Sequence, residues 1–148
     1  MNVRGVRGAI TVPANSRDEI GARAVELVQA MLRENRVAPR EIAAAFFTLT
    51  PDLDADFPAH AVRRLGPEWT HVPLMCATEI AVAGALPRVL RVMILANTAR
   101  PPSKIRHQYL GGTACLRPDL EPGPTARTAR KPNTRNSRNT KISDGARP

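Results

Sequence analysis

A single long apolar stripe with helical spacing is the feature that most restricts the fold of this chain. Ser16 and Glu19 form a capping-box pattern at its start, and Asn35 is a candidate left-handed residue at its end. The other apolar segments are short and rich in β-branched or aromatic residues, so we expect one long helix among several strands. The stripe consists of Ile20, Ala24, Leu27, Val28, Met31 and Leu32.

The remaining segments predict the order of strands and turns around this helix. Pro58 can open a short helix over residues 58–65, and residues 104–109 are expected to form a helical turn. This order predicts an α+β fold, in which a mixed β-sheet has one long helix packed on one face. The uncovered face of the sheet needs a partner, so we expect a homo-oligomer. The strand candidates are residues 3–12, 43–50, 70–76, 89–96 and 113–116.

Positive charge is concentrated at the C-terminal end of the chain. The 22 Lys and Arg residues exceed the 13 Asp and Glu residues, and residues 123–148 carry +6 of the net charge of +9. This segment has one large aliphatic side chain, Ile142, and cannot bury enough apolar surface to offset its chain entropy. We therefore expect one folded domain at residues 1–122 and a basic disordered tail at residues 123–148. Such a tail attracts polyanions, including nucleic acid, non-specifically; the simpler interpretation is a solvated extension without a partner.

Several classes of protein are disfavoured by what the sequence lacks. No apolar run reaches the roughly 20 residues of a membrane span, and the first residues do not form a signal peptide. Cys76 and Cys115 have no zinc-ligand spacing, and GxSxG, P-loop and GxGxxG motifs are absent. We therefore expect a cytoplasmic protein without a metal ion or cofactor. Each of the three histidines is more typical of a surface or half-buried polar residue than of a base.

Charged side chains inside apolar segments are the best candidates for a functional site. Arg7 lies within the first expected strand, Arg91 within VLRVMILA, and Arg117 follows the last expected strand. A guanidinium among apolar side chains requires an anionic or carbonyl partner. Arg91 could form a structural ion pair with Glu79, or several arginines could bind a small dianion through charge-assisted hydrogen bonds. Together with the only tyrosine, Tyr109, this set fits positioning and electrostatic stabilisation rather than covalent catalysis.

Ordered motifs along residues 1–120 give the sequence a specific resemblance. Taken together, they resemble the monofunctional, trimeric α/β class of bacterial chorismate mutases, which differs from the all-helical class with the same activity. Each motif is weak alone, and their order is specific. The motifs include VRGVRGA at 3–9, TPDL at 50–53, FPA at 57–59, CATEI at 76–80, LRV at 90–92, IRHQYL at 105–110 and LRPDL at 116–120.

The resemblance implies an activity, an assembly and a pathway. The family converts chorismate to prephenate by an intramolecular [3,3] rearrangement, the committed step from the shikimate pathway towards phenylalanine and tyrosine. Because one molecule rearranges within itself, no nucleophile, metal ion or cofactor is needed. The family forms a homotrimer with a pseudo-barrel architecture, and its active sites lie between adjacent subunits.

The resemblance also implies roles for four catalytic residues. Arg91 would donate to the ether oxygen and to a carboxylate of chorismate, and Arg7 would bind a carboxylate. Tyr109 would add a further donor. Glu79 would accept from the ring hydroxyl and stabilise the developing allylic cation, with Cys76 beside it.

Further residues are implied in substrate binding. Phe57, Ala59 and Leu74 would form apolar walls, while Arg63, Leu116 and Arg117 would help to close the site. Two positions depart from the family pattern: His60 stands where a family member has Lys, and Met75 where it has Thr. We expect both changes to affect affinity before the chemical step.

Two alternatives remain open at the level of sequence. A related trimeric architecture occurs in the RidA-like small-ligand binding and imine deaminase proteins, which typically read a carboxylate with one arginine. The combination of Arg7, Arg91, Tyr109 and Glu79 disfavours that reading. A polyanion-binding role of the tail would show steep salt dependence and could coexist with mutase activity.

Overall fold

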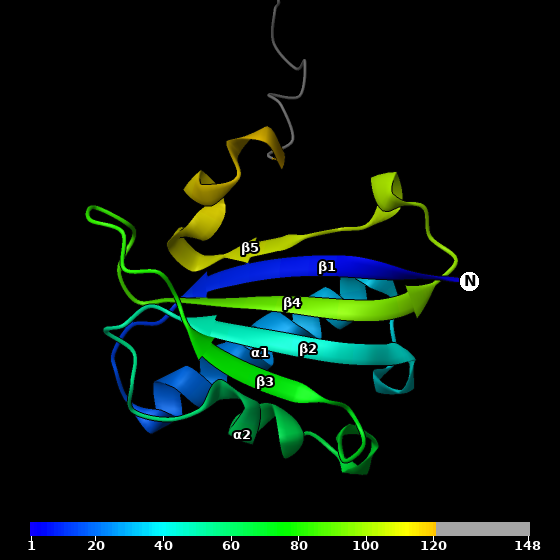
Figure 1. The fold of residues 1–148 in the computed structure, drawn as a ribbon, viewed down its shortest axis with the longest axis horizontal. Coiled ribbons are helices and arrows are strands. Elements are labelled where there is room, and N and C mark those ends of the chain that lie inside the picture. Colours follow the sequence, from blue (N-terminus) through cyan, green and yellow to red (C-terminus); the bar gives the residue numbers. More distant parts are fainter. Residues whose placement is uncertain (121–148) are drawn as a thin grey trace, which may run out of the picture.

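A mixed five-stranded sheet organises the computed structural model, which describes residues 1–120 (Figure 1). The strand order is β3-β2-β4-β1-β5. β4 pairs antiparallel with both β1 and β2, whereas the outer strands β5 and β3 run parallel to β1 and β2. The expected α+β fold with a mixed sheet is therefore confirmed. The strands are β1 (Asn2–Thr11), β2 (Ile42–Leu49), β3 (Leu74–Thr78), β4 (Val89–Thr98) and β5 (Gln108–Leu110).

Helix α1 (Arg17–Asn35) lies behind the sheet in Figure 1 and α2 (Pro58–Arg63) lies along its β3 edge, and residues 1–120 place no α-helix on the front face. Helix α1 buries the predicted apolar stripe, and α2 packs against α1 and β3. Gly8 lets α1 approach the sheet closely, because a Cβ at this position would lie 2.6 Å from Met31 Sδ. None of the helices in residues 1–120 is both long and apolar enough to span a bilayer.

The two ends of α1 differ in how well the sequence predicts them. The Ser16 hydroxyl accepts from the Glu19 backbone N–H at 3.2 Å, as the capping pattern predicts. The prediction of Asn35 as the left-handed cap is wrong, because Arg36 has that conformation, with φ 54°. Asn35 is instead buried, and its side-chain amide donates to Met31 O and Arg106 O and accepts from Arg106 N, each at 2.8 Å. These bonds tie the end of α1 to the segment before β5.

The C-terminal part of the described chain departs most from the prediction. Residues 108–110 form β5 rather than part of a helical turn, since this extended segment supplies backbone partners to the edge of β1. The strand expected at residues 113–116 is wrong, because Gly111–Leu116 is a 3-10 helix. Gly111 has φ +57° and ends the extended backbone, and the Thr113 hydroxyl donates to Ala9 O at 3.0 Å. Here a side chain, rather than a strand, binds the carbonyl of β1.

Strand β3 also begins later in the sequence than expected. A 3-10 turn at Pro67–Trp69 buries Trp69, and the strand begins only at Leu74 rather than at residue 70. The expected tail at residues 123–148 lies outside the described residues. Further 3-10 turns occupy Pro39–Glu41, Pro102–Lys104 and Pro118–Leu120.

Candidate active site

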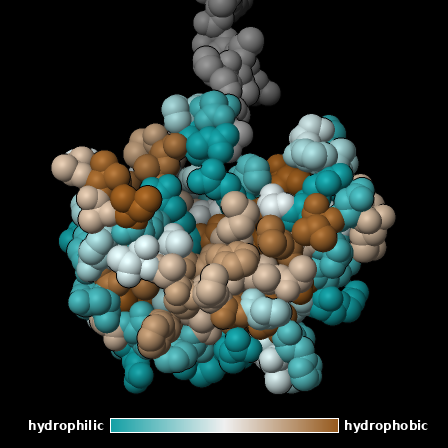
Figure 2. Space-filling view, in the orientation of Figure 1, coloured by the Kyte–Doolittle hydropathy of each residue, from teal (hydrophilic) through white to brown (hydrophobic). Residues whose placement is uncertain are grey.

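The front face of the sheet carries a cavity of about 210 Å³ beside its charged side chains. Strand register places Arg91 opposite Thr48 on β2 and Ala9 on β1, while Arg7 lies opposite Met93. Paired residues share a face of a sheet, so these side chains point away from α1. The centre of this face is apolar and its rim is polar (Figure 2). The cavity is lined by Arg7, Gly8, Ala9, Phe46, Thr48, Arg91, Val92, Met93 and Tyr109.

Glu79 is fixed beside this cavity by two side chains that meet the same carboxylate oxygen. Arg91 Nε lies 2.8 Å from Glu79 Oε1, and the Thr48 hydroxyl donates to that oxygen at 2.7 Å. The Glu79 backbone N–H donates to Leu49 O at 2.8 Å, which fixes the main chain just after β3. The Glu79 side chain is 14% exposed and that of Arg91 34%. Within residues 1–120, no hydrogen bond is made by the second Glu79 oxygen or by the terminal guanidinium nitrogens of Arg91.

Arg7 is held through its backbone by a histidine. Its N–H donates to His107 Nδ1 at 3.0 Å. Burial lowers the pKa of His107, and the nearby charges of Arg117 and Arg7 lower it further. A neutral ring keeps Nδ1 free to accept this bond. The hydroxyl of Tyr109, in the adjacent strand β5, is buried without a hydrogen-bond partner among the described residues. Arg117 is a charged neighbour of this phenol.

Arg117 is held by a nearby carboxylate. Its Nε and Nη2 donate to the two oxygens of Asp119 at 2.9 and 2.7 Å. This pair raises the pKa of Arg117 and lowers that of Asp119. The structure places neither Arg117 nor Leu116 in the lining of the front cavity, although both follow the turn that leaves β5.

A second group of predicted residues surrounds a cavity of about 340 Å³ next to α2 and β3. Phe57 and Cys76 both line it, together with the loop that precedes α2. Burial raises the pKa of the Cys76 thiol. Met75, one residue earlier in β3, is exposed and pairs in register with Phe46, so it lies on the front face. The structure thus places Cys76 in a different cavity from Arg91.

The other predicted residues on α2 and β3 have distinct surroundings. Ala59 and Leu74 pack against the hydrophobic core. Arg63 donates to the carbonyls of Trp69 at 3.0 Å and Thr70 at 3.3 Å, which fixes the turn before β3. His60 Nδ1 lies 2.9 Å from Asp56 Oδ1, and its ring meets the ring of Phe57 edge-on.

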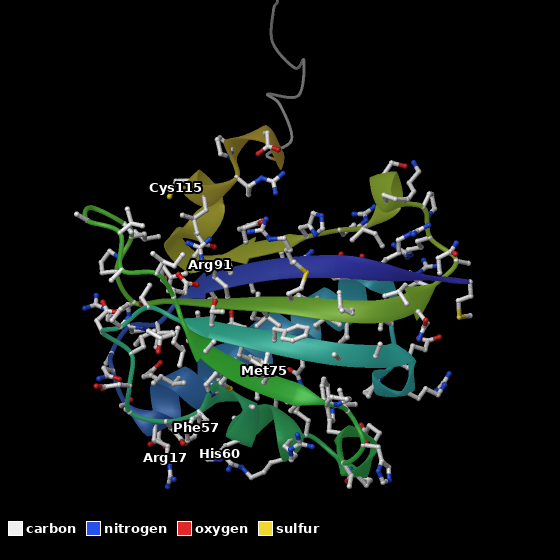
Figure 3. The ribbon with its side chains drawn as sticks, viewed as in Figure 1. Arg17, Phe57, His60, Met75, Arg91 and Cys115 are labelled. Carbon is white, nitrogen blue, oxygen red and sulfur yellow. The ribbon has the colours of Figure 1, made fainter. Side chains whose placement is uncertain are left out.

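The predicted site residues therefore form two separate groups within one chain. Arg7, Arg91 and Tyr109 line the front cavity, and Glu79 contacts Arg91 there. Phe57 and Cys76 line the second cavity, and His60 contacts Asp56 and Phe57 in its lining. Strands β2 and β3 intervene between Arg91 and the α2 group (Figure 3). Fold and site together define an α+β protein with two arginines and a glutamate beside a cavity, on a sheet face that no α-helix of residues 1–120 covers.

Three residues that the sequence reading did not single out hold this arrangement together. Thr48 donates to Glu79, His107 accepts from the Arg7 N–H, and Asp56 contacts both Phe57 and His60. Because side chains alternate along a strand, the segment AAAFFTLT predicts that Thr48 shares a face of the sheet with Phe46 and that Phe47 lies on the other face. The other two depend on contacts between segments distant in sequence or on a loop conformation, and no local pattern indicates them.

Comparisons with known proteins agree with one another. The family model of chorismate mutase type I matches residues 3–120. The chain is 47% identical to chorismate mutase AroH of Thermus thermophilus over 120 residues, covering 80% of this chain and 97% of that protein. It is 41% identical to chorismate mutase AroH of Bacillus subtilis strain 168, covering 81% of this chain and 94% of that protein. A solved chorismate mutase from Clostridium thermocellum matches with a TM-score of 0.74 and 42% identity, over 76% and 99% of the two chains.

The chain belongs to the bacterial chorismate mutase type I family. It is accordingly an isomerase of aromatic amino acid biosynthesis. These relatives give no support to the RidA-like or polyanion-binding alternatives.

Proposed function

We propose that this chain converts chorismate to prephenate at a site built around Arg91 and Glu79. The observation that carries the proposal is the fixed Glu79 carboxylate, with Arg91 and Thr48 on one oxygen and the other oxygen unbound within the described residues. A carboxylate held in this way can accept from the ring hydroxyl of the substrate. It also lies where negative charge would stabilise positive charge developing on the ring.

Arg91 has the complementary role in this proposal. Rearrangement stretches the ether C–O bond and moves negative charge onto the ether oxygen and the enolpyruvyl fragment. The terminal nitrogens of Arg91, which the described residues leave unbound, would donate to that oxygen and to a carboxylate. Because the ion pair with Glu79 already orients the guanidinium, little reorganisation is needed as charge develops.

Arg7 and Tyr109 would bind the rest of the dianion. Both line the front cavity, and the Tyr109 hydroxyl has no protein partner there among the described residues. The hydrogen bond from the Arg7 backbone N–H to His107 Nδ1 fixes the main chain of Arg7, from which its guanidinium would extend to the substrate. These donors supply binding and orientation, which can account for a large part of the barrier in a reaction of one molecule.

We also propose that the active enzyme is a trimer with a pseudo-barrel arrangement. Two observations support a site shared between chains: the predicted residues form two groups separated by β2 and β3, and the front face exposes Val3 and Met75. In the assembly, Phe57, His60 and Cys76 of one chain would meet Arg7, Arg91 and Glu79 of its neighbour. Leu116 and Arg117 would close the site. A cytoplasmic location fits both described cysteines, which are free thiols.

The test is turnover of chorismate by the purified protein and by Arg91→Ala. We expect conversion to prephenate by the wild type, and a loss of about 10²- to 10³-fold in kcat/KM for the variant, the order seen when a preorganised donor is removed. Arg40→Ala is the matched control, because Arg40 is exposed and its side chain makes no bond in residues 1–120. A wild type that is folded but inactive refutes the function. A loss of less than tenfold refutes the role of Arg91.

Sedimentation of the same wild-type preparation tests the assembly. We expect a mass of three chains. A monomer that turns over chorismate with full activity would contradict a site shared between subunits.

A further inference from the structure

Asp56 is the point at which three donors converge beside the second group of site residues. Its Oδ1 accepts from the Phe57 backbone N–H at 2.8 Å and lies 2.9 Å from His60 Nδ1. Its Oδ2 accepts from Arg17 Nε at 3.0 Å. Arg17, Phe57 and His60 gather at one edge of the molecule in Figure 3. No role in the reaction has yet been given to Asp56.

The Asp56 carboxylate is a fixed group rather than a mobile surface charge. Its side chain is only 10% exposed. The loop that carries it is bound to Asn15, whose side-chain oxygen accepts from the backbone N–H groups of Asp54 and Ala55 at 3.0 Å each. The Phe57 N–H lowers the pKa of Asp56 against the effect of burial, and His60 and Arg17 lower it further. Asp56 is therefore ionised at neutral pH.

The strengths of the contacts around Asp56 differ. Arg17 is 74% exposed, so its ion pair is a weak surface interaction. The bonds to Phe57 and His60 are shorter, and both Asp56 and Phe57 line the second cavity. Removing the Asp56 carboxylate should therefore affect Phe57 and His60 more than Arg17.

This geometry determines which ring nitrogen of His60 can meet a ligand. A carboxylate oxygen accepts only, so the contact at 2.9 Å requires a proton on Nδ1. The Phe57 ring limits rotation of the imidazole, with the ring centroids 5.2 Å apart and the planes at 71°. His60 remains 54% exposed, so Nε2 is the nitrogen left for a partner. While Asp56 holds Nδ1, a second carboxylate can accept a hydrogen bond only from a protonated Nε2. Both ring nitrogens then carry a proton, and the imidazole is a cation.

We propose that Asp56 is a positioning residue of the chorismate site: it orients Phe57 and directs Nε2 of His60 towards a carboxylate of the substrate. The inference rests on the function proposed above. It gives His60 the same task as a lysine at that position, the capture of an anion, by a different means. A lysine reaches the anion through a flexible stem, whereas this imidazole needs a neighbouring carboxylate to hold it.

The kinetic test combines Asp56→Asn with His60→Ala. Asp56→Asn keeps the shape and removes the charge, and we expect it to raise KM for chorismate about fivefold with kcat nearly unchanged. In the His60→Ala background the same change should have no further effect on KM, because Asp56 acts through His60. Glu68→Gln is the matched control: this exposed carboxylate makes no hydrogen bond or ion pair within residues 1–120, and we expect its loss to leave KM unchanged. Thermal unfolding of each variant checks that it is folded.

An NMR measurement tests the geometry without reference to turnover. Long-range ¹H–¹⁵N spectra show which nitrogen of His60 carries the proton, and His60→Ala identifies its signals. In the ligand-free wild type we expect a proton on Nδ1, and in Asp56→Asn a smaller fraction in that form.

The outcomes separate this inference from the proposed function. A wild type without turnover refutes the function, while the NMR result still decides the geometry. Turnover with an unchanged KM in Asp56→Asn overturns the positioning role. An equal rise in KM in both backgrounds overturns the action through His60, and a wild-type proton found on Nε2 overturns the hydrogen bond itself.

Discussion

Removing the Thr48 hydroxyl is a direct test of how the Glu79 carboxylate is held. Thr48→Val keeps the volume of the side chain and removes the donor that lies 2.7 Å from Glu79 Oε1. We expect kcat/KM for chorismate to fall about tenfold. The structural cost should be small, because the Thr48 side chain faces the front cavity rather than the core.

The magnitude follows from the surroundings of Glu79. A hydrogen bond to a charged group contributes about 1.5 to 3 kcal/mol, and each 1.36 kcal/mol corresponds to about a tenfold change in rate. Arg91 still contacts the same oxygen at 2.8 Å, and the 14% exposure of Glu79 lets water replace part of the lost bond. Both effects place the expected loss at the lower end of this range.

Initial rates of chorismate loss, measured by absorbance across a range of concentrations, give kcat and KM separately. Thr48→Ser is the control, because it restores the hydroxyl without the methyl group and should remain within about threefold of the wild type. A Val variant with wild-type kcat/KM would refute the role of Thr48 in holding Glu79. If the Ser variant is as slow as the Val variant, the effect comes from packing and not from the hydrogen bond.

Two further predictions concern stability. Gly8→Ala should lower the free energy of unfolding in urea by about 1 to 3 kcal/mol, because its Cβ would lie 2.6 Å from Met31 Sδ and 2.9 Å from Leu27 Cδ1. Gly5→Ala, on the opposite face of β1, should destabilise the fold less, because the nearest atom to its Cβ would lie at 3.3 Å. An equal loss of stability in the two variants would contradict the reasoning. The lowered pKa of His107 means that the unfolded chain takes up a proton first as the pH falls below the ordinary histidine value of 6.5, so stability contributed by this residue is present above that pH and is lost below it. Urea unfolding at several pH values should show a shallower loss for His107→Gln than for the wild type, and identical slopes would exclude His107 as the source.

The sequence predicts those helices and strands whose own residues form a long, regular pattern. The helical stripe from Ile20 to Leu32 repeats over several turns, and VLRVMILA is too apolar and β-rich for an exposed segment, so α1 and β4 were predicted correctly. β5 has only three residues, and its extended shape depends on pairing with β1. No pattern within IRHQYL contains that information, so the sequence alone predicts a helical turn there.

The same distinction applies to the candidate site. Arg91 and Glu79 were conspicuous because each is a charge within an apolar segment, and the ion pair considered from the sequence is present. Asp56 belongs to the polar run DLDAD, which is typical of a solvated loop, and only the fold brings it against His60. The sequence predicts only an ordinary polar role for His107, because its partner is a backbone amide 100 positions earlier.

The position of β1 in the sheet has a consequence for how the chain is made. β1 is synthesised before the other four strands of the sheet, yet its partners are β4 and β5, with Asn2 opposite Thr98 and Ile10 opposite Leu110. Pairing across such sequence separations slows folding, because the intervening loop must close before the contacts form. During translation the first strand therefore waits without a partner until β4 leaves the ribosome. A nascent chain that stops before residue 89 can pair β2 with β3, but it lacks the strand that joins β1 to them.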